Sequence, residues 1–207
     1  MRFPDFYAAA PVVATFDPLA ALLGASADGL LDYRYEDVVR LAGHSCPTVA
    51  GAFLVGRAAL AALYPDGPAE RGSISVDMPA AEDHGTTGVI AQVLTLLTGA
   101  AADNGFQGLA GRFGRRGLLR FADSASDGEG AIIFRRRDNG QAVAVSLDVS
   151  HVPGDPATRG RLTAILQGSA DAATYEAFGL GWQERVQRLL LEYADDPRVI
   201  RVVMLAN

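Results

Sequence analysis

The chain contains no lysine and only one cysteine, Cys46, among its 207 residues. A single cysteine excludes a disulfide within the chain and any cysteine-rich zinc finger. Positive charge comes from arginine alone, and 18 arginines against 24 acidic residues leave a formal net charge of −6. Non-specific nucleic-acid binding relies on a strongly positive surface, so the composition argues against a nucleic-acid partner.

Long apolar runs are also missing. The longest, such as residues 49–55, fall far short of the ~20 residues that span a bilayer. The first residues lack the charged start and apolar core of a signal peptide, so we expect a cytoplasmic protein without a membrane partner. With 49% hydrophobic and 20% charged residues, the chain suits one domain, 1–207, that can bury a sizeable core.

The spacing of apolar residues predicts both helices and strands. Helices are expected at 18–23, 35–41, 47–63, 89–97, 157–167, 171–178 and 181–194. Strands are expected at 73–78, 118–122, 131–136, 141–149 and 198–205, with hairpin turns at 126–128 and 138–140. Residues 1–16 suggest an extended arm, 29–34 a connector and 99–116 a glycine-rich irregular stretch. This order predicts a single α+β domain, with helices packed on a mixed, mainly antiparallel sheet.

The segment 43–47, Gly-His-Ser-Cys-Pro, is the strongest local signal for chemistry. Pro47 suits the first position of the helix, because the N–H that proline lacks would be unsatisfied there. Cys46 then occupies the N-cap, beside open N–H groups and the positive end of the helix dipole. Such a position favours the thiolate, which binds metals or attacks electrophiles. His44 can offer an imidazole to the same point.

Two further segments accompany this motif. A second helix ends in a Gln…Leu-Thr-Gly segment at 92–99, and a Phe-Gly-Arg segment at 113–115 leads into a strand that ends at Phe121. With these parts, residues 35–122 resemble the formylmethanofuran dehydrogenase E-like family. The resemblance implies an α+β homodimer in which His44 and Cys46 hold a metal ion, usually zinc. The C-terminal zinc ribbon of many members is absent, and Thr86 and Thr87 stand where members commonly have a further cysteine.

His44 and Cys46 supply only half of the four ligands that zinc prefers. His84 precedes the second apolar helix as His44 and Cys46 precede the first. If the two helices pack side by side and parallel, their N-termini converge, and we expect His84 to be the third ligand of zinc or another divalent transition metal. Asp83 is then a fourth ligand or the acceptor that orients an imidazole. A coloured preparation would instead indicate haem, iron or cobalt.

Arginines gather near the glycine-rich stretch. Because arginine forks suit carboxylate and phosphate, we expect Arg112 or Arg115 to contact a small anionic ligand. The glycines do not form Gly-x-Gly-x-x-Gly after a strand, and no Gly-Lys-Ser/Thr occurs, so neither a dinucleotide site nor an ATP site is predicted. His151 follows an apolar strand and is a site residue or a hydrogen-bonded histidine at the strand end.

Three functions remain open. The leading hypothesis is a metal-binding protein of the formylmethanofuran dehydrogenase E-like type. The second is a metal-dependent enzyme that acts on a small anionic substrate through an open metal position. The third is a structural or partner-binding protein in which Cys46 is inert. A Cys–His nucleophile ranks below metal binding, because one intervening residue makes the required hydrogen bond between Cys46 and His44 awkward.

Overall fold

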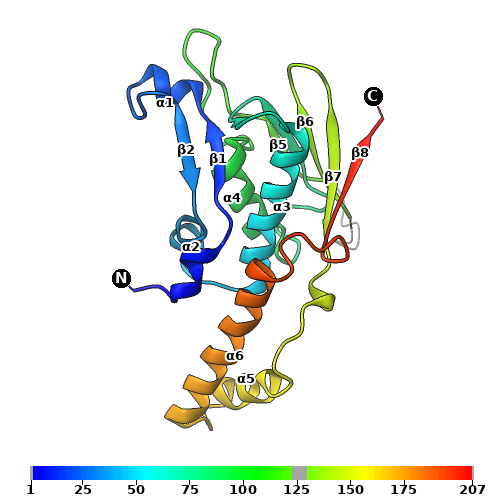
Figure 1. Cartoon of the computed structure of the whole chain (residues 1–207). Helices are drawn as coiled ribbons and strands as arrows, with labels where there is room; N and C mark the ends of the chain where they lie inside the picture. Colours follow the sequence, from blue (N-terminus) through cyan, green and yellow to red (C-terminus); the bar gives the residue numbers. More distant parts are fainter. Residues whose placement is uncertain (1, 123–129, 207) are drawn as a thin grey trace.

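The computed structural model describes residues 2–122 and 130–206. Within these ranges the chain forms two mixed β-sheets and six α-helices (Figure 1), which confirms the predicted α+β class. The strands divide into a three-stranded sheet, with the order β2-β1-β3, and a five-stranded sheet, with the order β5-β4-β6-β7-β8. Each described helix is too short or too polar to cross a bilayer.

The smaller sheet was not expected. Strand β1 (Val13–Phe16) pairs antiparallel with β2 (Leu30–Tyr33) and parallel with β3 (Ala69–Glu70). The predicted arm at 1–16 and connector at 29–34 are therefore wrong, and residues Asp5–Ala9 form a 3₁₀ helix, η1. Strands of four, four and two residues are too short for apolar alternation to distinguish them from loops.

The larger sheet contains the expected strands in shorter form. They are β4 (Ile74–Asp77), β5 (Leu119–Arg120), β6 (Ile132–Arg136), β7 (Ala142–Leu147) and β8 (Ile200–Leu205). All neighbours are antiparallel except β4 and β5. The turn at 138–140 joins β6 to β7 as predicted, with Gly140 at φ +77°. The turn at 126–128 lies outside the described residues. A hairpin of β5 with β6 is wrong, because the two strands flank β4 on opposite sides.

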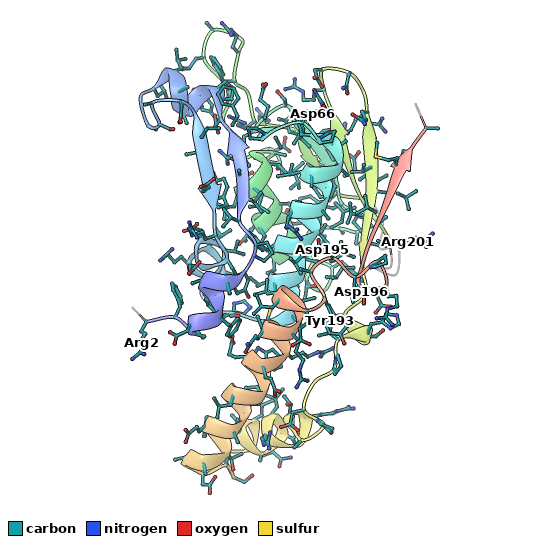
Figure 2. All side chains as sticks on the ribbon, viewed as in Figure 1. Arg2, Asp66, Tyr193, Asp195, Asp196 and Arg201 are labelled. Atoms are coloured by element: carbon teal, nitrogen blue, oxygen red, sulfur yellow. The ribbon has the colours of Figure 1, made fainter. Side chains whose placement is uncertain are left out.

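Helix α3 (Pro47–Leu63) lies at the centre of the core and packs beside α4 (Thr87–Thr98). Gly56 permits this close approach, since a Cβ there would lie 2.5 Å from Leu97 Cδ1. The other helices of the main body are α1 (Pro18–Leu22) and α2 (Tyr35–Ala42). Arg57, the one charged residue of α3, donates to Asp195 Oδ1 at 2.8 Å, and Figure 2 labels Asp195 beside α3.

The C-terminal helices extend from the body. After the short η2 (Val149–His151), α5 (Thr158–Leu166) packs against α6 (Ala172–Leu191), and Figure 1 shows the pair reaching away from both sheets. The expected helices 171–178 and 181–194 are one continuous helix. Gly179 and Gly181 weaken a helix without ending it, so the predicted break between them was wrong.

Candidate functional site

The motif turn before α3 forms as the sequence predicts. Cys46 is the N-cap, with an extended backbone at φ −151°, and Pro47 follows at the first helical position. The N–H of Val49 donates to Cys46 Sγ at 3.4 Å. The cysteine sulfur thus takes the place that a serine or aspartate oxygen usually has at a helix start.

The same turn is fastened to α6 through Ser45. Its carbonyl accepts from Trp182 Nε1 at 3.0 Å and from Gln183 Nε2 at 3.3 Å, while its Oγ lies 2.8 Å from the hydroxyl of Tyr35. Tyr7 donates to Gln183 Oε1 at 3.0 Å and completes the network. Burial raises the pKa of Tyr35, so the phenol stays neutral and available for hydrogen bonding. This network was invisible in the sequence, since Trp182 lies 137 residues from Ser45.

The three predicted metal ligands do not come together. His44 is exposed, with Nδ1 3.0 Å from the carbonyl oxygen of Ala42. His84 is half-buried and lies in the wall of a cavity that neither His44 nor Cys46 lines, and Asp83 is exposed. In the described ranges no three His, Cys, Asp or Glu side chains are placed to hold one metal ion. These residues therefore do not form a complete zinc site within the chain.

The convergence of the two helix starts is nevertheless present. Thr48 of α3 lines the same cavity as Thr86 and Thr87 at the start of α4, and Leu94 and Leu97 lie beside Gly56 further along. The helices accordingly run side by side in the same direction. We call this cavity, of about 380 Å³, the helix-mouth cavity.

Arg112 and Arg115, the two arginines for which an anionic ligand was predicted, both line a second cavity. Its volume is about 220 Å³, and Arg71 and Arg137 line it as well. Glu70 is the acidic residue in this wall, and it accepts a hydrogen bond from Ser73 Oγ at 2.6 Å. We call this cavity the arginine pocket. Arg71 was missed because it follows the unpredicted β3. Arg137 follows β6, far along the chain from the glycine-rich stretch, so the sequence favoured Arg112 and Arg115 over it.

A buried ion cluster adjoins the arginine pocket through Arg71 and Arg115, which line the pocket and bind Asp17. Asp17 is 4% exposed and accepts from Arg115 Nη2 at 2.8 Å and from Arg71 Nη1 at 2.5 Å. It also caps α1, accepting from the N–H groups of Leu19 and Ala20 at 2.9 and 3.2 Å. Burial opposes ionisation of Asp17, but the two arginines and two N–H groups outweigh it, and its pKa lies below the ordinary value.

Arg115 is enclosed with part of its hydrogen-bonding capacity unused. Its side chain is 9% exposed, and Nη1 has no partner among the described residues. A Cβ at Gly72 or Gly99 would lie 2.0 or 2.6 Å from this nitrogen, and both glycines have positive φ. Only glycine fits at these two positions. Asp17 faces two guanidinium groups, and with Glu70 the pocket has two carboxylates against four arginines, so positive charge is in excess here.

The loop that carries Arg112 is strained. Phe113 has φ +61° and Ala110 has φ +48°, a region that residues with a Cβ rarely adopt. The guanidinium of Arg112 stacks over the Phe113 ring, 5.0 Å from its centroid. Backbone strain of this kind persists where the surroundings hold it, and it gathers at ligand sites.

His151 stands apart from both cavities. It ends η2, is about half exposed, and its Nε2 lies 3.5 Å from Asp148 Oδ2. Of the two alternatives for His151, this placement fits the histidine at the end of a strand. His151 lines neither the helix-mouth cavity nor the arginine pocket.

Comparison of the chain with models of known protein families and with curated proteins finds no match. The likeness to the formylmethanofuran dehydrogenase E-like family therefore stays a prediction from the motif segments.

Proposed function

We propose that the chain binds a small, multiply charged oxyanion, a phosphate or a small dicarboxylate, in the arginine pocket. The observation that carries this proposal is the excess of positive charge around the pocket, where four arginines face two carboxylates. Arg71 and Arg115 share the carboxylate of Asp17, and Glu70 supplies a second negative charge in the wall. Arg112 and Arg137 add two further positive charges to the same wall. Positive charge gathered in one concave wall attracts anions, and an oxyanion would compensate the excess.

The donor geometry supports the same ligand class. Guanidinium groups present paired N–H donors that match carboxylate and phosphate oxygens. Arg112 is exposed and stacked on Phe113, so its N–H edges remain free to turn toward a ligand at the mouth. Arg115 is fixed by Asp17 below. The pocket thus combines a rigid base with adjustable arginines at its rim.

Isothermal titration with sodium phosphate and with malonate tests this proposal. The wild-type protein is expected to bind at least one of the two. Arg112→Gln is expected to raise the Kd about tenfold to a hundredfold, since a hydrogen bond to a charged group contributes about 1.5–3 kcal/mol.

Arg116→Gln is the matched control. Arg116 is on the same loop and 52% exposed, but it faces Asp103 at 3.5 Å and does not line the pocket. Absence of binding to either anion, or an equal loss in the two variants, would refute the proposal.

Metal binding through His44 and Cys46 is a second proposal, implied by the resemblance. Two observations support it: Cys46 Sγ lies at the start of a 17-residue helix, and the exposed His44 is two residues away. Further ligands would come from a second copy of the chain or from solvent. Elemental analysis of untagged protein after zinc addition should show about one zinc per chain in wild type and none in His44→Ala or Cys46→Ala. Protein that takes up no zinc contradicts this proposal, and retention in His84→Ala excludes only His84.

A homodimer and a cytoplasmic location also remain proposals. The free outer edge of β8 supports the dimer, because Val202, Val203 and Met204 are 38%, 42% and 49% exposed on the last strand of the larger sheet. Natural proteins usually protect such an edge. Light scattering after gel filtration is expected to give twice the chain mass, and Val203→Lys to reduce it to the monomer.

A further inference from the structure

The helix-mouth cavity contains a set of polar groups that the arginine pocket does not explain. Thr87 is 8% exposed, yet its hydroxyl makes no hydrogen bond to any described residue. The hydroxyl is not among the sealed, unpartnered polar atoms of the interior, so it opens onto the cavity. The side chain is thus almost entirely enclosed, while its hydroxyl faces the cavity without a protein partner and is available to a ligand.

The other polar side chains in this wall are two hydroxyls and one imidazole. The hydroxyls of Thr48 and Thr86 and the imidazole of His84 make no hydrogen bond to the described residues. The starts of α3 and α4 add N–H groups and the positive ends of two helix dipoles. Since Pro47 has no N–H, Thr48 offers the first one of α3. No arginine, aspartate or glutamate is among the described residues that line the cavity.

The remaining wall is apolar. Strands β6 and β7 contribute Ile132, Val145 and Leu147. Met78 and Ile90 are further apolar residues of the wall. Ile132 and Val145 are 7% and 0% exposed, so this surface belongs to the core. At about 380 Å³ the cavity falls within the range of small-molecule sites, which combine apolar walls with a few convergent polar groups.

We propose that the helix-mouth cavity binds a small monocarboxylate with an apolar body. The carboxylate lies at the two helix starts and accepts from Thr87 and Thr48, and the apolar body lies on the floor formed by β6 and β7. Hydroxyl and imidazole donors together with two helix N-termini suit one negative charge. This site is separate from the arginine pocket, whose wall shares none of its residues.

Isothermal titration with acetate, butyrate, hexanoate and the neutral hexanamide tests the proposal. Affinity is expected to rise about threefold to fourfold for each CH₂ that becomes buried. Hexanamide, which lacks the charge, is expected to bind at least tenfold more weakly than hexanoate. Thr87→Val keeps the side-chain shape and removes the hydroxyl, so it is expected to weaken hexanoate binding about tenfold or more.

Thr95→Val is the matched control, because Thr95 lies on the same helix but outside this cavity. Thermal melts of both variants verify that they fold. Absence of hexanoate binding at millimolar concentration overturns the proposal, as does equal binding of hexanoate by Thr87→Val and wild type. Competition between hexanoate and phosphate would place the carboxylate in the arginine pocket and also overturn it. Binding that occurs only with added zinc would assign the site to a metal instead.

Discussion

Replacing Asp17 tests most directly whether the buried ion cluster stabilises the fold. Asp17→Asn keeps the size of the side chain and an oxygen that can cap α1, but it removes the negative charge. Arg71 and Arg115 then lose the carboxylate that both of them bind, and their side chains are only 16% and 9% exposed. Removing one partner of a buried ion pair costs about 3–5 kcal/mol. For a chain of this length, that corresponds to a fall in Tm of roughly 6 to 20 °C.

Urea unfolding monitored by the circular dichroism of the helices measures the free-energy difference, and a thermal melt gives the Tm. Asp138→Asn is the control, because Asp138 also pairs with an arginine, Arg136, but is 53% exposed. Exposed pairs contribute about 0–1 kcal/mol. If Asp17→Asn costs no more than Asp138→Asn, the cluster does not stabilise the fold and the argument fails.

The pH dependence of the unfolding free energy of wild type and Asp17→Asn tests whether the stability difference between them is electrostatic. The pKa of Asp17 is lowered in the folded state, so its ionised form is favoured by folding. Its contribution is fully present above the unfolded value of about 3.9 and is lost as the pH falls through the folded pKa. Wild type should therefore lose part of its stability advantage over Asp17→Asn in this acid range. A stability difference between the two proteins that does not change with pH would contradict this prediction.

Two further predictions concern α3. Gly56→Ala should destabilise the protein by about 1–3 kcal/mol in urea unfolding, because the added Cβ would lie 2.5 Å from Leu97 Cδ1. Gly179→Ala in α6 is the control: a Cβ there meets no atom within 4 Å, so this change should be neutral or stabilising by up to about 1 kcal/mol. Cys46→Ser should be at least as stable as wild type in the same assay, since serine is a preferred N-cap, whereas Cys46→Ala should lose about 0.5–2 kcal/mol. Equal stability of the serine and alanine variants would show that the sulfur does not cap the helix.

Local signals were sufficient for the features that depend on neighbours in the chain. Asp17-Pro18 and Cys46-Pro47 both start helices, and Asn139-Gly140 makes the turn between β6 and β7. In each case the determining interaction spans three residues or fewer, such as Val49 N–H to Cys46 Sγ. Proline and glycine set the backbone angles there, so the sequence alone defines the structure.

The candidate sites were only partly predictable, since long-range contacts build them. Asp17 has the sequence signature of a helix cap, and nothing nearby shows that it also binds Arg115, 98 residues away. Arg71 follows a two-residue strand whose existence depends on pairing with β1. The converging helix starts were anticipated from two similar apolar helices. The separation of His84 from Cys46 depends on the path of the turn, which Ser45, Trp182 and Gln183 hold in place.

Helix α4 relates the two proposed sites through its polarity. Its start lies at the helix-mouth cavity, and its last carbonyls lie beside the arginine pocket, where Arg71 Nη2 donates to the carbonyl of Leu96 at 2.9 Å. The C-terminal end of a helix carries partial negative charge, so it repels an anion, whereas the N-terminal end attracts one. An oxyanion beside the end of α4 therefore needs the arginines to overcome the helix dipole. At the opposite end the dipole favours the ligand, and hydroxyls with one imidazole suffice. The polarity of this helix thus agrees with the contrast between a pocket lined by arginines and a cavity lined by none.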